Sequence, residues 1–111
     1  MANKIINIER DFSRYPAGRY VDDGPYSGQR FRERFLIPAL SEESGGKIFI
    51  ELDGARGYGS SFLEEAFGGL IRAGFSAADV LNRLELKSQD ESLVEEIEGY
   101  IREQANISQQ Y

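Results

Sequence analysis

The sequence of 111 residues contains no histidine, no cysteine and no tryptophan. Without imidazole or thiol groups, it offers neither a Ser-His-Asp triad nor a thiolate nucleophile, and it lacks the common ligand sets for zinc. It can form no disulfide, which agrees with a reducing compartment. The chemistry left open rests on carboxylate, lysine, tyrosine and serine side chains. We therefore expect a protein that is not an enzyme and that needs no metal or cofactor.

Long apolar runs are absent as well. No stretch approaches the roughly 20 apolar residues of a membrane span. The opening residues MANKIINIERDF carry charges where a signal peptide would carry its apolar segment. We therefore expect a cytoplasmic protein without membrane contact. A hydrophobic content of 41% suits one globular domain over residues 1–111, and the polar residues 106–111 are expected to fray.

Positive charge is scarce and unevenly placed. The net charge is −6, but residues 1–40 carry seven basic and five acidic side chains, whereas residues 41–111 carry six basic and fourteen acidic ones. The two parts thus differ by ten charges, from +2 to −8. An acidic surface disfavours nucleic acid and anionic membranes, because both are bound by neutralising phosphates with lysine and arginine. A basic protein partner is easier to accommodate.

The stretch KIFIELDGARGYGSSFLEEAFGGLI, residues 47–71, organises the chain. Residues 48–52 form an apolar run typical of a strand that is covered on both faces. A glycine-rich turn follows. Phe62, Ala66 and Leu70 then share one helical row with Leu63, Phe67 and Ile71 beside it, which predicts an amphipathic helix. Two interior glycines, at positions 68 and 69, oppose this helix at about 1 kcal/mol each, but the burial of five large apolar side chains outweighs them.

The remaining patterns complete an α/β domain. Alternation predicts an N-terminal strand over residues 4–12, a short returning edge strand at residues 19–21, and a strand within residues 81–87. Ser27 is expected to cap a helix that Pro38 ends or kinks near residues 36–37. Ser76 is expected to begin a short helix, and Asp90 the last one. The predicted fold is a small mixed β-sheet of about four strands flanked by helices.

Two segments, RYVDDGPYSGQRFRE and the strand, turn and helix with its serine pair, resemble the STAS-like domain of unknown function, a bacterial relative of the anti-sigma factor antagonists. The resemblance implies a regulatory domain that binds a protein partner, often a histidine-kinase-like ATPase. In those antagonists an Asp-Ser-Ser motif opens the corresponding helix, and the ATPase phosphorylates its first serine to break the complex. The matching serine here is Ser60. Gly59 stands where the antagonists have aspartate, which puts this phosphorylation in doubt.

We interpret the turn and the first helical residues as the partner-binding site. The residues assigned to it are Arg56, Gly57, Tyr58, Gly59, Ser60, Ser61 and Phe62. Tyrosine is favoured at protein interfaces, which supports this interpretation. A purely structural alternative is that one serine caps the helix, with Glu64 completing a capping box with Ser61.

A second functional hypothesis is a nucleotide- or phosphate-binding sensor. The run from Gly54 to Ser61 nearly matches a P-loop but has serine where the phosphate-binding lysine is required. Its expected phosphate contacts are Gly54, Arg56, Gly59 and Ser60. Asp53 could bind magnesium at a strand end, although Asp-Gly is more often a simple turn pair. We therefore predict no metal site.

Overall fold

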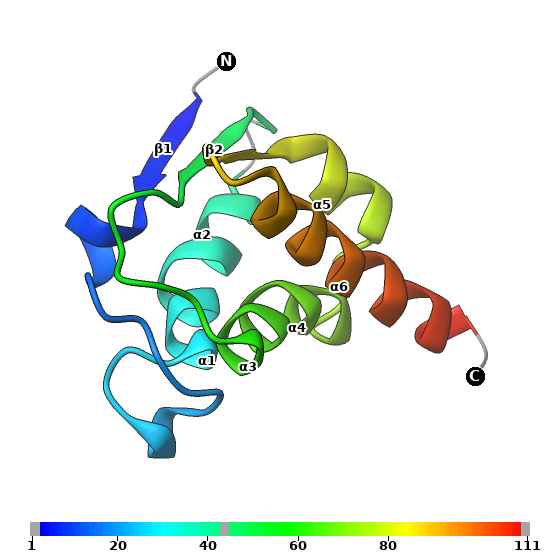
Figure 1. Cartoon of the computed structure of the whole chain (residues 1–111). Helices are drawn as coiled ribbons and strands as arrows, with labels where there is room; N and C mark the ends of the chain where they lie inside the picture. The colour runs from blue at the N-terminus through cyan, green and yellow to red at the C-terminus, as the bar shows by residue number, and fades with distance from the viewer. Residues whose placement is uncertain (1–2, 43–44, 110–111) are drawn as a thin grey trace.

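The computed structural model describes residues 3–42 and 45–109 and contains a three-stranded sheet. Its strands are β1 (Lys4–Asn7), β2 (Ile48–Glu51) and β3 (Leu84–Lys87), in the order β1-β2-β3. Both neighbouring pairs are parallel, so the expectation of a mixed sheet was wrong. The α/β class is confirmed, but the fourth strand predicted at residues 19–21 is not formed (Figure 1).

Local side-chain bonding explains this missing strand. The Asp23 carboxylate accepts the N–H groups of Arg19 and Tyr20, at 3.2 and 2.8 Å. These donors are therefore not free for a neighbouring strand, and the chain turns into η2 (Val21–Asp23), a single 3₁₀ turn.

The N-terminal strand is shorter than its alternation predicted for a similar reason. The Asn7 side chain accepts the N–H of Arg10 at 3.0 Å, and the N–H of Asn7 donates to Asp11 at 2.8 Å. This capping starts the wide helical turn η1 (Ile8–Phe12) directly after the strand. Ile8 still reaches the core, but from a helix rather than a strand.

One face of the sheet is covered and the other is exposed. Ile6, Ile48 and Ile50 are buried beneath the helices, whereas Ile5 on the opposite face is 62% exposed and Phe49 is only half-buried. Figure 1 shows the helices gathered on one side of the strands. The expectation that the central strand is covered on both faces was wrong, since the buried positions alternate along it.

The first long helix spans residues 28–40 as α1 (Gly28–Phe31), η3 (Arg32–Leu36) and α2 (Ile37–Leu40). Ser27 caps it as predicted, accepting the N–H of Arg30 at 3.2 Å. Pro38 does not end this helix. The N–H of Ile37 bonds to the carbonyl of Arg32, five residues back instead of four, and this wider turn accommodates the proline ring.

The central helix spans residues 60–72 as α3 (Ser60–Leu63), η4 (Glu64–Gly68) and α4 (Gly69–Arg72). One of its two unfavourable glycines, Gly69, has a packing role, and so does Gly28 of the first helix. A side chain at Gly69 would overlap the Arg32 guanidinium of the first helix. One at Gly28 would overlap the carbonyl oxygen of Phe62, so both helices cross at close range.

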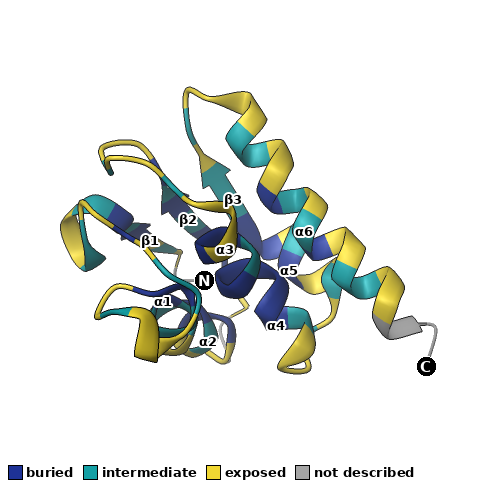
Figure 2. Cartoon of the chain, turned by 60° about the horizontal axis from the view of Figure 1, so that its bottom comes forward, coloured by how far each residue is buried: buried dark blue, intermediate teal, exposed yellow. Residues whose placement is uncertain are grey.

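The C-terminal third adds α5 (Ala77–Arg83) and α6 (Glu91–Gln109). Ser76 caps α5 as expected, accepting the N–H of Asp79 at 3.1 Å, and Asp90 accepts the N–H of Ser92 at the start of α6. Helix α6 continues to Gln109, so the polar tail expected from residue 106 is helical up to that point. Figure 2 shows the buried faces of the helices meeting in the middle of the domain. The buried apolar residues are Ile6, Ile8, Phe31, Leu36, Ala39, Leu40, Ile48, Ile50, Leu52, Phe62, Leu63, Ala66, Phe67, Leu70, Val80, Leu84, Ile97 and Ile101.

Candidate functional site

The turn at residues 53–59 leaves the carboxyl end of the central strand and leads into the central helix. Gly54 and Gly57 have φ angles of +103° and +149°, which only glycine adopts without strain. Asp53 fastens the start of the turn, since its carboxylate accepts the hydroxyl of Ser88 at 2.8 Å and the N–H of Gln89 at 3.0 Å. Asp53 therefore has a structural role, and no group of metal-binding side chains occurs in the described part of the chain.

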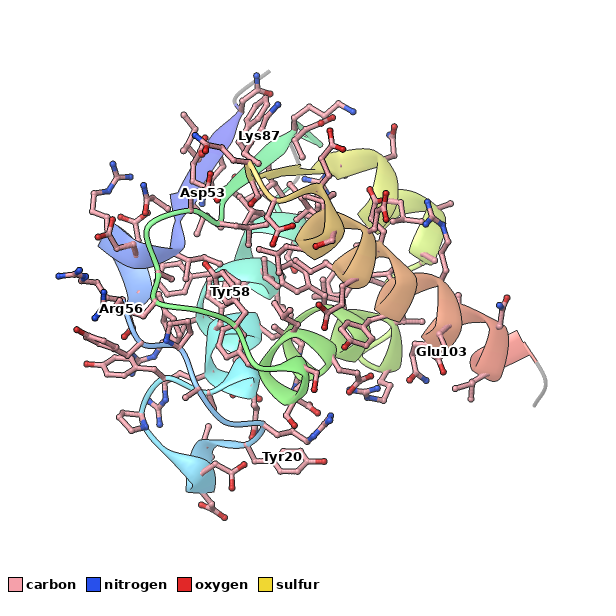
Figure 3. All side chains as sticks on the ribbon, in the orientation of Figure 1. Tyr20, Asp53, Arg56, Tyr58, Lys87 and Glu103 are labelled. Carbon is pink, nitrogen blue, oxygen red and sulfur yellow. The ribbon has the colours of Figure 1, made fainter. Side chains whose placement is uncertain are left out.

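Tyr58 closes the turn from inside. Its hydroxyl donates to the carbonyl oxygen of Leu52 at 2.6 Å, and its ring lies 6.0 Å from that of Phe62. Burial raises the pKa of the Tyr58 phenol well above its ordinary value. The side chain is half-buried, so Tyr58 shapes the turn more than it contributes free surface. Figure 3 shows Tyr58 lying over the body of the domain, while Arg56 points away from it.

The two serines lie at the start of the central helix and are exposed. The N-cap of this helix is Gly59, which has no side chain to cap with, and Ser60 and Ser61 are the first two helical residues. Neither hydroxyl makes a hydrogen bond within the described residues. The structural alternative, in which Ser61 and Glu64 form a capping box, was therefore wrong. The first turn leaves backbone donors and two hydroxyls facing solvent.

The predicted partner surface needs one further correction. Phe62 is completely buried, packing against Phe12 and Phe31 with ring centroids 6.3 and 6.1 Å away. It cannot touch a partner in the folded domain. The exposed members of the predicted site are Arg56, Gly57, Gly59, Ser60 and Ser61. They follow one another along the chain, except that the half-buried Tyr58 separates Gly57 from Gly59.

A network of charged side chains behind this stretch was not predicted. Glu65 is 6% exposed and lies 2.8 Å from Arg32 of the first helix. Glu64 lies 2.5 Å from Arg19 and 2.7 Å from Arg72. The hydrogen bonds from Arg72, and then those from Arg19, lower the pKa of the Glu64 carboxyl. These partners are up to 46 residues apart in the chain, so no local sequence pattern reveals them.

This network fixes the beginning of the central helix. It joins that helix to the first helix through Arg32 and to the preceding loop through Arg19. The same loop is pinned by its backbone, since the carbonyls of Gly18 and Arg19 accept the N–H groups of Gly28 and Gln29, each at 3.0 Å. The exposed serines thus stand on a rigid support, which suits a recognition site.

The proposed phosphate contacts fit their role poorly. A side chain at Gly54 would come within 2.7 Å of the Glu9 carboxylate, so a negative charge already lies against that part of the turn. An incoming phosphate would be repelled there. Arg56, Gly59 and Ser60 are exposed, but the described residues enclose no pocket around them.

Taken together, fold and site define an α/β domain that presents an exposed serine pair at the first turn of its central helix. The chain belongs to the family of the STAS-like domain of unknown function, whose sequence pattern matches residues 27–93. This match confirms the resemblance and includes the first helix, the central strand, the turn and the central helix. No curated protein and no solved structure matched the chain. Among the described helices, none is long and apolar enough to span a bilayer.

Proposed function

We propose that this chain is a non-catalytic regulatory domain, acting in the cytoplasm, that binds a protein partner through the exposed stretch from Arg56 to Ser61. The observation that carries this proposal is the exposure of both serine hydroxyls, which make no hydrogen bond in the described structure and do not cap their helix. A residue pair with no role in folding is available for recognition.

The surroundings of the pair support binding rather than catalysis. The chain has no histidine to act as a base toward Ser60. The turn is glycine-rich and exposed at the carboxyl end of the central strand, where an approaching protein can reach its backbone. The exposed Arg56 adds one charged anchor of the type enriched in interfaces.

The partner class that the family resemblance favours is a histidine-kinase-like ATPase, which would phosphorylate Ser60. A phosphate there adds about 1.5 to 2 negative charges at neutral pH. The positive end of the helix favours such a charge by about 0.3–1 kcal/mol, so folding survives. An anion buried without a partner in an interface costs several kcal/mol, so the complex breaks before the fold does.

The proposal is tested by comparing Ser60→Ala with Ser60→Asp, using Ser61→Ala as the matched control. All three variants should remain folded by circular dichroism. Ser60→Ala should bind a histidine-kinase-like ATPase that captures the unmodified chain, and Ser60→Asp should not. Equal binding by Ser60→Asp, together with no phosphate on Ser60 in protein from cells, would contradict the switch. Titration with ATP and GTP, with and without magnesium, separates this function from the nucleotide-sensor hypothesis, because only the latter predicts saturable binding.

A further inference from the structure

Two exposed tyrosines lie beside the serine turn, the name used here for the turn at residues 53–59 together with Ser60 and Ser61. Tyr15 is 60% and Tyr26 is 44% exposed, although tyrosine rings usually bury much of their surface. Tyr26 is held in place. The N–H of Ala17 donates to the carbonyl of Tyr26 at 3.0 Å, and the Tyr26 ring packs edge-on against Phe12 with centroids 5.6 Å apart. The Tyr26 ring therefore has a fixed position, and the backbone bond from Ala17 holds it beside the loop that carries the exposed Tyr15.

Arg14 and Arg56 join these tyrosines to the proposed partner-binding turn. The backbone N–H of Arg56 donates to the carbonyl of Arg14 at 2.7 Å, so the two loops lie side by side. Figure 1 shows the segment after η1 running next to the loop between β2 and α3, and Figure 3 shows Arg56 projecting from that side. We define Arg14, Tyr15, Tyr26 and Arg56 as the arginine–tyrosine surface.

The two arginines of this surface have little ion pairing within the described residues. Within residues 3–42 and 45–109, no carboxylate lies within ion-pair distance of Arg56, although the chain has 19 acidic residues against 13 basic ones. Arg14 has only a long contact of 3.6 Å to Glu9, and its side chain is 56% exposed. A guanidinium in this position can form bidentate hydrogen bonds with a carboxylate from outside.

We propose that the arginine–tyrosine surface docks an acidic segment of the partner protein, next to the serine turn. This inference rests on the proposed function and names the chemistry that the partner must present. Exposed arginines supply the charge complementarity and the tyrosines supply contact area of low entropic cost. The two exposed arginines favour an acidic peptide locally, against the overall expectation of a basic partner. The net charge of −6 opposes every anion, and it opposes most strongly a nucleic acid, which carries a negative charge at every nucleotide.

The test titrates three probes into the isotope-labelled full chain and follows the amide NMR signals. The probes are a glutamate-rich peptide containing leucines, a lysine-rich peptide of the same length, and an oligothymidylate. The glutamate-rich peptide should shift the signals of Arg14, Tyr15, Tyr26 and Arg56, and the binding should weaken as salt is added. The other two probes should bind more weakly.

Matched charge reversals locate the binding. Arg14→Glu with Arg56→Glu should weaken the glutamate-rich peptide by about tenfold or more, since two ion pairs become repulsions. Lys4→Glu with Arg102→Glu lowers the net charge by the same four units on exposed positions elsewhere and should change the affinity much less. Tyr15→Ala, at an exposed ring, should weaken binding without affecting folding.

Three results would overturn this inference: no shift with the glutamate-rich peptide, tighter binding of oligothymidylate, or equal losses in both charge-reversal pairs. Concentration-dependent shifts without any probe would mean that the surface binds a second copy of the chain, which also contradicts it. These outcomes leave the proposed function open to its own test. If Ser60→Asp still abolishes partner binding while the acidic peptide does not bind, only this inference fails. If the peptide binds and Ser60→Asp has no effect, only the switch fails.

Discussion

Two parts of the central helix differ in how their polar side chains are used. Glu64 and Glu65, in its second turn, are surrounded by Arg19, Arg32 and Arg72. Ser60 and Ser61, one turn earlier, make no hydrogen bond within the described residues and face solvent. The comparison shows that polar residues four positions apart can serve separate purposes. The glutamates hold the central helix to its neighbours, whereas the serines are exposed and are the residues that the proposed function assigns to a partner.

The largest effect should come from removing Glu65. Glu65→Ala leaves Arg32, whose side chain is only 12% exposed, without its carboxylate partner, and breaking such a buried pair costs about 3–5 kcal/mol. Glu95→Ala on the exposed side of α6 should stay within about 0.5 kcal/mol and serves as the control. Urea unfolding measures both. Equal stabilities would show that the network does not hold the helices.

Replacing two glycines by alanine should change the stability less, and in opposite directions. Gly69→Ala should destabilise by about 1–3 kcal/mol, because the added methyl group must displace the Arg32 guanidinium. Gly99→Ala, in the exposed part of α6 with open space around it, should stabilise by about 0.5–1 kcal/mol. Thermal midpoints of the two variants should therefore move in opposite directions. A stabilising Gly69→Ala would contradict the close helix crossing.

Tyr58 precedes both parts, in the turn before the helix, and its replacement should cause a smaller loss of stability. Tyr58→Phe keeps the ring contact with Phe62 but removes the hydrogen bond to Leu52, which costs about 1 kcal/mol. Partner affinity should change little, since the hydroxyl faces inward. A large loss of affinity with unchanged stability would instead show that the Tyr58 hydroxyl contacts the partner and does not stabilise the turn.

The network should also make stability depend on acid pH. The pKa of Glu64 is lowered in the folded state, so its contribution is present above the unfolded pKa of about 4.3 and is lost as the pH falls through the folded value. Glu64→Gln should therefore flatten the decline of the thermal midpoint below about pH 4. A decline of unchanged slope in Glu64→Gln would assign the acid sensitivity to other carboxyl groups.

Local signals in the sequence predicted most of the helices and where they begin. Contacts between residues far apart in the chain determined features that the sequence did not predict. Ser27 and Ser76 cap their helices because a cap depends on residues two or three positions away. The need for glycine at position 69 could not be predicted, because the side chain that requires it, Arg32, is 37 positions earlier in the chain. The strand predicted at residues 19–21 failed because the Asp23 carboxylate takes its backbone donors.

The turn and the helix start that carry the candidate site were predicted, but the burial and the partners of their side chains were not. The sequence pattern indicated the turn and the helix start correctly. It assigned Phe62 to the partner surface, whereas the aromatic cluster with Phe12 and Phe31 buries this ring. It also offered Ser61 and Glu64 as a capping box, but Glu64 is held by Arg19 and Arg72 from other parts of the chain. Competition for the same carboxylate is a tertiary effect that no local pattern contains.

The central claim is that Glu64 and Glu65 stabilise the fold whereas Ser60 and Ser61 do not. Its most direct test is the free energy of unfolding of the double variant Ser60→Ala with Ser61→Ala, compared with that of the unmodified chain. If both hydroxyls are free of structural duties, the two proteins should agree within about 0.5 kcal/mol. If either serine caps the helix, its loss should cost about 1 kcal/mol or more. A loss of that size would contradict the central claim, because the serine pair would then belong to the fold rather than to the partner.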